Sequence, residues 1–165
     1  MRVLRAVAVV LISIPLCLFL AWKLFELWHF VGIIPPSIGL SHPIAINGST
    51  GFREGCGIAV FRIDSSTRRK IRLNGLDFLK EATQSRRDND PYHTFSQWRL
   101  TPNQAFTHDD QTILSPGLEC AELNHSLQQQ LEAASRTAGS YYVYGPEKVL
   151  FVSPELGIVA LAYNG

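Results

Sequence analysis

The chain has 165 residues and a formal net charge of +1, from 15 lysine and arginine residues against 14 aspartate and glutamate residues. A total this close to neutral favours no particular class of ligand. The length leaves room for a single small domain once the apolar N-terminal segment is set aside, so a second folded domain is not expected.

The N-terminal segment is predicted to be a transmembrane helix. Residues 6–22 carry no charge, and at about 1.5 Å per residue this run covers roughly 26 Å, just short of the ~30 Å hydrocarbon core of a bilayer. The apolar pattern continues beyond Lys23, whose long side chain can reach the lipid head groups. We therefore expect a helix that contacts the lipid bilayer over about residues 3–34 and ends at Pro35, which cannot continue it.

A cleaved signal peptide is the alternative interpretation of this segment. The small-x-small cleavage site nearest the apolar run would need Ala21 with a small residue two positions before it, and Phe19 is too large. We therefore expect residues 1–34 to remain attached as a signal-anchor, which makes the chain a single-pass membrane protein.

The charges that flank the apolar run predict its orientation. Arg2 and Arg5 precede the run, whereas no basic residue follows Lys23 until Arg53. Because the positively charged flank stays in the cytoplasm, we expect a cytoplasmic N-terminus and an extracytoplasmic domain, periplasmic or extracellular, in the cell envelope. Nucleic acid is not an expected partner there.

Residues 35–51 are predicted to be a linker, because they combine Pro, Gly, Ser and Asn with scattered Ile and show no sustained period. Residues 52–165 then form the domain. Residues 53–87 carry nine basic against four acidic side chains, a net +5, and residues 88–165 carry three against nine, a net −6. The two halves can fold against each other, so that their charges neutralise. Alternatively, the basic half can form a face that binds anionic lipid or polysaccharide.

Apolar runs and turn residues predict an α+β domain. In chain order we expect a strand at 57–63, a helix after Asp64, a polar loop at 84–91, a strand at 94–100, an irregular segment at 103–114, a helix at 116–138, and a three-stranded meander at 141–144, 149–152 and 158–163. Gly75 predicts a break or a close packing contact in the earlier helix. The expected architecture is a mostly antiparallel sheet with two helices on one face.

Two cysteines lie in the predicted domain, and an oxidising compartment favours a disulfide bond between them. Cys120 shares one face of the predicted helix with Leu123, Leu127 and Leu131, so we expect it to point into the core. Cys56 begins a strand that can reach this face. Closing the loop between the two cysteines would contribute about 4 kcal/mol to stability.

A cysteine-dependent hydrolase is the alternative interpretation of Cys56, because its small neighbours would expose a thiol that His93 or His125 could activate. The sequence contains no Gly-x-Ser-x-Gly, phosphate-loop, His-Glu-x-x-His or dinucleotide motif, and we expect no cofactor. Glu122 and His125 have the spacing of a helical carboxylate–histidine metal motif, but the second copy that such a site needs is missing, so no metal site is expected.

Four basic residues lie near the start of the first helix of the domain: Arg68, Arg69, Lys70 and Arg72. The backbone N–H groups of a helix N-terminus and these cations could act on the same anion. For a domain tethered to a bilayer, anionic lipid head groups are the nearest candidate. The alternative interpretation is an ordinary solvated turn.

Aromatic residues gather in the least regular stretch of the domain, namely Tyr92, Phe95, Trp98 and Phe106. They either cover the open side of the sheet or line a surface that binds a partner.

Two functions remain for this chain. The favoured one is a membrane-tethered binding or accessory module with an unknown ligand and a protein partner in the envelope, because anchoring raises the effective concentration of a weak binder. The alternative is a small envelope hydrolase built on Cys56 and a histidine. The state of Cys56 distinguishes them, since a disulfide-bonded sulfur cannot attack a substrate.

Overall fold

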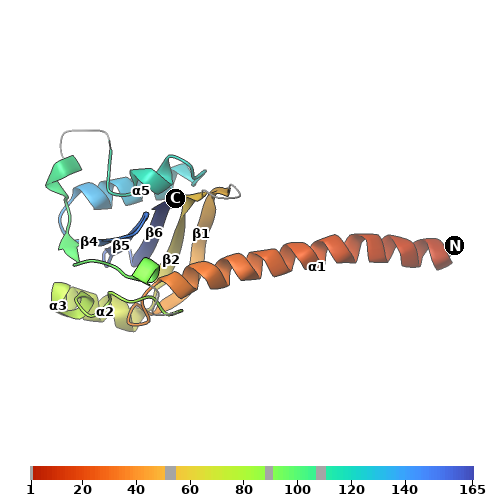
Figure 1. Ribbon diagram of the computed structural model, residues 1–165, viewed down its shortest axis with the longest axis horizontal. Helices are drawn as coiled ribbons and strands as arrows, with labels where there is room; N and C mark the ends of the chain where they lie inside the picture. Colours follow the sequence, from red (N-terminus) through yellow and green to blue (C-terminus); the bar gives the residue numbers. More distant parts are fainter. Residues whose placement is uncertain (1, 51–54, 88–90, 107–110) are drawn as a thin grey trace.

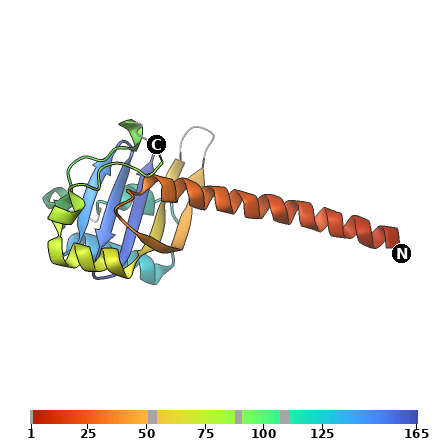
Figure 2. The same cartoon turned by 90° about the horizontal axis from the view of Figure 1, so that it is seen from below.

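A computed structural model describes residues 2–50, 55–87, 91–106 and 111–165 of the chain. A six-stranded antiparallel sheet forms the middle layer, and helices cover both of its faces (Figure 1, Figure 2). Within the described residues the strands run in the order β1-β2-β6-β5-β4-β3. Their bounds are β1 Leu40–Thr50, β2 Gly55–Ile63, β3 Arg99–Leu100, β4 Tyr141–Gly145, β5 Lys148–Ser153 and β6 Ile158–Asn164.

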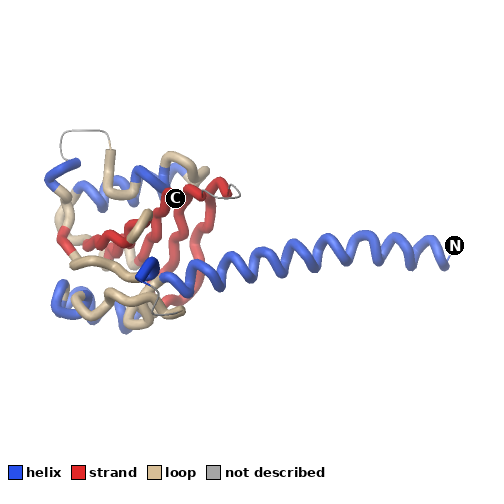
Figure 3. Tube along the Cα trace, viewed as in Figure 1, coloured by secondary structure: helices blue, strands red, loops and turns tan. Residues whose placement is uncertain are grey.

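The helices differ greatly in length (Figure 3). Their bounds are α1 Arg2–Ile33, α2 Ser65–Asn74, α3 Leu76–Leu79, α4 Ser115–Leu118 and α5 His125–Arg136, with short 3-10 helices η1 Pro91–His93 and η2 Gln104–Phe106. The predicted N-terminal helix is confirmed by α1, which ends just before Pro35. Its Leu11–Ile33 part is the one helix of the described chain that is long and apolar enough to cross a membrane. The predicted α+β class is confirmed.

The sheet is buried on both faces, so the prediction of two helices on one face is wrong. Along β2, Ala59 and Phe61 pack towards α1, α2 and α3, whereas Ile58 and Val60 pack towards α4 and α5. The same alternation continues in β5 and β6. A strand that is covered on both sides is apolar at every position, which explains the unbroken apolar runs of these strands.

Residues 40–50, which we predicted to belong to a linker, form the edge strand β1 instead and pair with β2. Two register shifts interrupt the pairing, one between Leu40 and His42 and one between Pro43 and Ala45. An extra residue in a strand moves the side chains that follow to the opposite face. The alternation that marks a strand is therefore lost from the sequence.

The helix predicted at 116–138 is two helices, α4 and α5, separated by residues 119–124. Asn124 starts α5 separately, because its side-chain oxygen accepts a hydrogen bond from the backbone N of Ser126 at 3.0 Å. The strand predicted at 94–100 is confined to β3. Gly75 separates α2 from α3 with a φ of 52°, which confirms the predicted break.

Candidate functional site

The last turns of α1 belong to the hydrophobic core of the domain. Phe30 and Ile33 are 7% exposed and Ile34 is fully buried, and they pack in one cluster with Phe61 of β2 and Leu161 of β6. These three residues of the N-terminal segment, which we expected to contact the bilayer, are covered by the domain instead. The described side chains from residue 11 to residue 25 are all exposed.

Two arginines between α3 and η1 hold the C-terminal end of α1. The backbone N–H groups of Arg86 and Arg87 both donate to the carbonyl oxygen of Gly32, at 3.0 and 3.1 Å. Nε of Arg86 donates to the carbonyl oxygen of Ile34 at 3.1 Å, and the guanidinium of Arg87 lies 4.3 Å from the centre of the Trp28 ring. Because the last carbonyl groups of a helix lack partners within it and carry partial negative charge, these contacts fix α1 to the domain.

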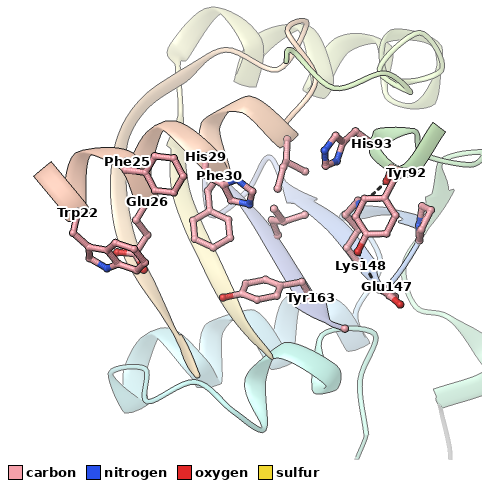
Figure 4. A pocket seen from close by; sticks show the side chains of 14 residues that line it. Trp22, Phe25, Glu26, His29, Phe30, Tyr92, His93, Glu147, Lys148 and Tyr163 are labelled. Atoms are coloured by element: carbon pink, nitrogen blue, oxygen red, sulfur yellow. Dashed lines mark hydrogen bonds between the residues drawn. The ribbon is translucent and has the colours of Figure 1, made fainter. Parts of the chain in front are cut away.

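A cavity of about 330 Å³ lies between α1 and the sheet (Figure 4). One wall is a single face of α1, since the lining positions repeat at helical spacing. The other wall is built by η1, by the turn between β4 and β5, and by β6. The lining residues of α1 are Trp22, Phe25, Glu26, His29, Phe30 and Ile33.

Polar groups gather at the end of the cavity that is distant from Trp22 (Figure 4). The hydroxyl of Tyr92 donates to the carboxylate of Glu147 at 2.6 Å, and Nζ of Lys148 donates to the carbonyl oxygen of Tyr92 at 2.7 Å. Nζ also lies 3.9 Å from the centre of the Tyr92 ring, within the range of a cation–π contact. Lys148 is only 8% exposed, so its ammonium group is held at the cavity wall.

Glu147 has an unusual backbone conformation. Its φ of 53° makes it the one non-glycine residue of the described chain in the left-handed region, which costs an L-residue about 1–2 kcal/mol. It lies in the tight turn between β4 and β5, and its carbonyl oxygen accepts a hydrogen bond from the backbone N of Asn164 at 2.9 Å. Residues held in such conformations occur often at binding sites.

His93, which lines the cavity, has an unsatisfied polar atom. Nδ1 of His93 is buried and has no hydrogen-bond partner within the described part of the chain, a situation that typically costs about 1–3 kcal/mol.

The two tyrosines that line the cavity stay protonated at neutral pH. The hydrogen bond to Glu147 and burial raise the pKa of Tyr92. Burial, with the nearby charge of Glu26, raises the pKa of Tyr163.

This arrangement is suited to binding an amphiphilic molecule, because an apolar wall leads to a few fixed polar groups. The described residues that line the cavity include no cysteine, serine or threonine. In the described ranges no group of three or more His, Cys, Asp or Glu side chains lies together as a metal ion would require.

Cys56 and Cys120 form a disulfide bond with their Cα atoms 5.8 Å apart, which confirms the predicted pair. Cys120 lies between α4 and α5, and not on a helix as we expected. His93 lies in the cavity wall, whereas His125 begins α5 on the other side of the sheet. The structure therefore does not bring the two candidate histidines to one site, and the sulfur of Cys56 is not a free thiol.

The four basic residues predicted to bind an anion lie on α2. The N-terminus of this helix already has a carboxylate, because Oδ1 of Asp64 accepts from the backbone N of Thr67 at 2.7 Å. Nε of Arg68 donates to the carbonyl oxygen of Pro154 at 2.7 Å and so ties α2 to the turn between β5 and β6. Because α2 lies at the end of the domain away from the N-terminus of α1 (Figure 1), its position does not favour contact with a bilayer. Anion binding stays a prediction, and its residues are Arg68, Arg69, Lys70 and Arg72.

The aromatic residues of the irregular stretch divide between the two alternatives. Phe95 and Trp98 are buried in the core that contains α1, and Nε1 of Trp98 donates to the carbonyl oxygen of Ala82 at 2.9 Å. Tyr92 lines the cavity. The side chain of Phe106 lies outside the described residues.

The sequence patterns did not predict the cavity. One signal was present, because Glu26 and His29 are polar residues on one face of an otherwise apolar helix. Nothing in the sequence marked Lys148, which reads as an ordinary turn residue before a strand.

No protein-family model, no curated protein and no solved structure matches this chain. The chain is an α+β domain with an apolar N-terminal helix docked on its sheet and a cavity at the junction.

Proposed function

We propose that the chain is a single-pass membrane protein whose extracytoplasmic domain is a binding module, and that the cavity beside α1 is its binding site. The observation that carries this proposal is that one helix supplies both the candidate membrane span and a wall of the cavity. The site is then held at a fixed height above the bilayer, without a flexible linker.

The position of the charged and aromatic residues of α1 supports this placement. If residues 3–25 span the bilayer, they cover roughly 34 Å, which exceeds the ~30 Å hydrocarbon core enough for the ends of this stretch to reach the lipid head groups. Lys23 and Glu26, which form an ion pair at 2.8 Å, then lie at the level of the lipid head groups, together with Trp22. The end of the cavity near Trp22 and Phe25 faces that level.

The orientation rests on Arg2 and Arg5, and the disulfide bond is compatible with an oxidising compartment. Paired fusions after Gly165 test it. An alkaline-phosphatase fusion should be active and a cytoplasmic reporter fusion silent, and the mature protein should retain residues 1–22. The opposite reporter pattern would overturn the proposed topology.

Binding in the cavity is tested with the full-length protein in amphipol and the uncharged apolar dye N-phenyl-1-naphthylamine. His29→Trp and Phe25→Trp enlarge side chains that line the cavity, and Leu24→Trp is the matched control, because Leu24 is exposed on α1 and does not line it. We expect the wild type and Leu24→Trp to enhance dye fluorescence and the two filling variants to lose most of the enhancement. Equal signals from all four proteins would show that the cavity does not bind the dye.

A further inference from the structure

We infer that the cavity binds one single-chain lipid from the outer leaflet, with a zwitterionic head group at its polar end. This inference rests on the proposed function, because it assumes that the domain lies on the outer side of the membrane. It adds the chemical class of the ligand and the residues that recognise each part of it.

The apolar part of the cavity fits one hydrocarbon chain. Its volume of about 330 Å³ is at the lower end of the usual range for ligand pockets, about 300–1,000 Å³, so a single chain fits better than a complete two-chain lipid. Phe30, Ile33 and Leu161 are buried and line its deeper part. Trp22 and Phe25 are 56% and 53% exposed and form the opening.

The polarity of the cavity has the same direction as that of a lipid in the outer leaflet. The opening near Trp22 belongs to the part of α1 that would enter the bilayer, and the polar groups lie towards the C-terminal end of α1 (Figure 4). A lipid that moves outward along α1 would therefore keep its chain towards the membrane and its head group away from it. The helix face from residue 22 to residue 33 is roughly 16 Å long, and the lipid would move about this far along α1.

Opposite charges stand side by side at the polar end. Glu147 and Lys148 are consecutive residues that both line the cavity, and each is oriented by a hydrogen bond with Tyr92. A phosphate would find the ammonium group of Lys148, with His93 in the same part of the lining, and an amine would find the carboxylate of Glu147. At this end a head group with only a negative charge would meet the carboxylate of Glu147, and one with only a positive charge would meet the ammonium group of Lys148.

The test uses the full-length protein in amphipol and lipids below their micelle-forming concentrations. Lysophosphatidylethanolamine, lysophosphatidylglycerol and an alkylammonium compound have one chain of equal length but zwitterionic, anionic and cationic head groups. We expect the zwitterionic lipid to displace N-phenyl-1-naphthylamine at a concentration about tenfold lower than the other two. Native mass spectrometry should show one bound molecule.

Variants test each part of the site. Lys148→Gln should weaken binding of the zwitterionic lipid about tenfold and leave the alkylammonium compound at least as well bound. Phe25→Trp changes only an exposed residue at the opening, so it should fold normally and still block the chain. Leu24→Trp should bind like the wild type.

The outcomes separate this inference from the proposed function. Dye binding that no lipid displaces, or equal displacement by all three head groups, would overturn the lipid assignment while the binding function stands. Absence of dye binding by the wild type would overturn both.

Discussion

Nε of Arg86 donates a hydrogen bond to the carbonyl oxygen of Ile34, 3.1 Å away, and so joins a loop of the domain to the first residue after α1. Ile34 is fully buried, and no stretch of free chain separates the apolar helix from the folded domain. The helix and the domain therefore form one unit, and the cavity between them depends on this junction.

Arg86→Ala should loosen the junction. The carbonyl groups of Ile34 and Ile38 both accept from the Arg86 guanidinium, and loss of a charged donor costs about 2 kcal/mol. We expect the melting temperature, followed by circular dichroism, to fall by about 4–8 °C. Arg69→Ala is the matched control on the exposed surface of α2 and should change stability by no more than about 0.5 kcal/mol. Equal melting temperatures for the two variants would contradict this role of Arg86.

The disulfide bond should make a large contribution to stability. It closes a separation of 64 residues, for which the chain-entropy model gives about 4 kcal/mol. Cys120→Ser should therefore melt well below the wild type, and non-reducing peptide mapping should recover the Cys56 and Cys120 peptides linked. Cys17, which is a free cysteine, lies in the proposed membrane span and is the reference for alkylation in the denatured protein only. If Cys56 and Cys120 are both alkylated in the native protein, the hydrolase alternative gains support.

Gly117 allows α4 to lie directly on the sheet. A Cβ atom at this position would lie 2.3 Å from the carbonyl oxygen of Gly57 and 2.7 Å from Cβ of Ala162. Gly117→Ala should therefore force the backbones apart and cost about 1–3 kcal/mol in chemical denaturation. In Gly32→Ala, the matched control, the new methyl group would meet Arg87 at an ordinary 3.4 Å and should not destabilise the protein. The close approach of α4 is refuted if the two variants are equally stable.

Tyr92 should make stability depend on pH in the alkaline range. Its hydrogen bond to Glu147 and its burial raise the pKa of the phenol, so the folded state favours the protonated form. This contribution is complete below the unfolded pKa of about 10 and is lost as the pH rises through the higher folded value. Tyr92→Phe should therefore lose less stability than the wild type above about pH 10, measured by denaturation at a series of pH values.

Glu147→Gln checks the cause of that shift. Without the carboxylate, the pKa of Tyr92 should move back towards its ordinary value, as measured by ultraviolet titration of the wild type and the variant with Tyr92→Phe as the blank. An unchanged titration would mean that Glu147 does not control this phenol.

Elements that depend on local chemistry were predictable from the sequence. The charge-free run and Pro35 determine α1, and Asp64 and Gly75 determine the start and the end of α2. The three strands of the meander were recognised because β-rich runs alternate with turn residues. The disulfide followed from two cysteines in one domain that we predicted to be exported. Each of these inferences needs only neighbouring residues or a count.

Tertiary structure alone decided the edge strand, the layers and the site. The strand β1 is stabilised by pairing with β2, and its register shifts hide its period. Helices cover both faces of the sheet because β2, β5 and β6 are apolar on both sides. The sequence shows these apolar runs, but it does not show which helix covers which face. The cavity arises only when α1 docks through contacts such as the one between Arg86 and Ile34, which are 52 residues apart. A local pattern contains no information about such a distant partner, so the face of α1 that lines the cavity is determined by the fold and not by the helix itself.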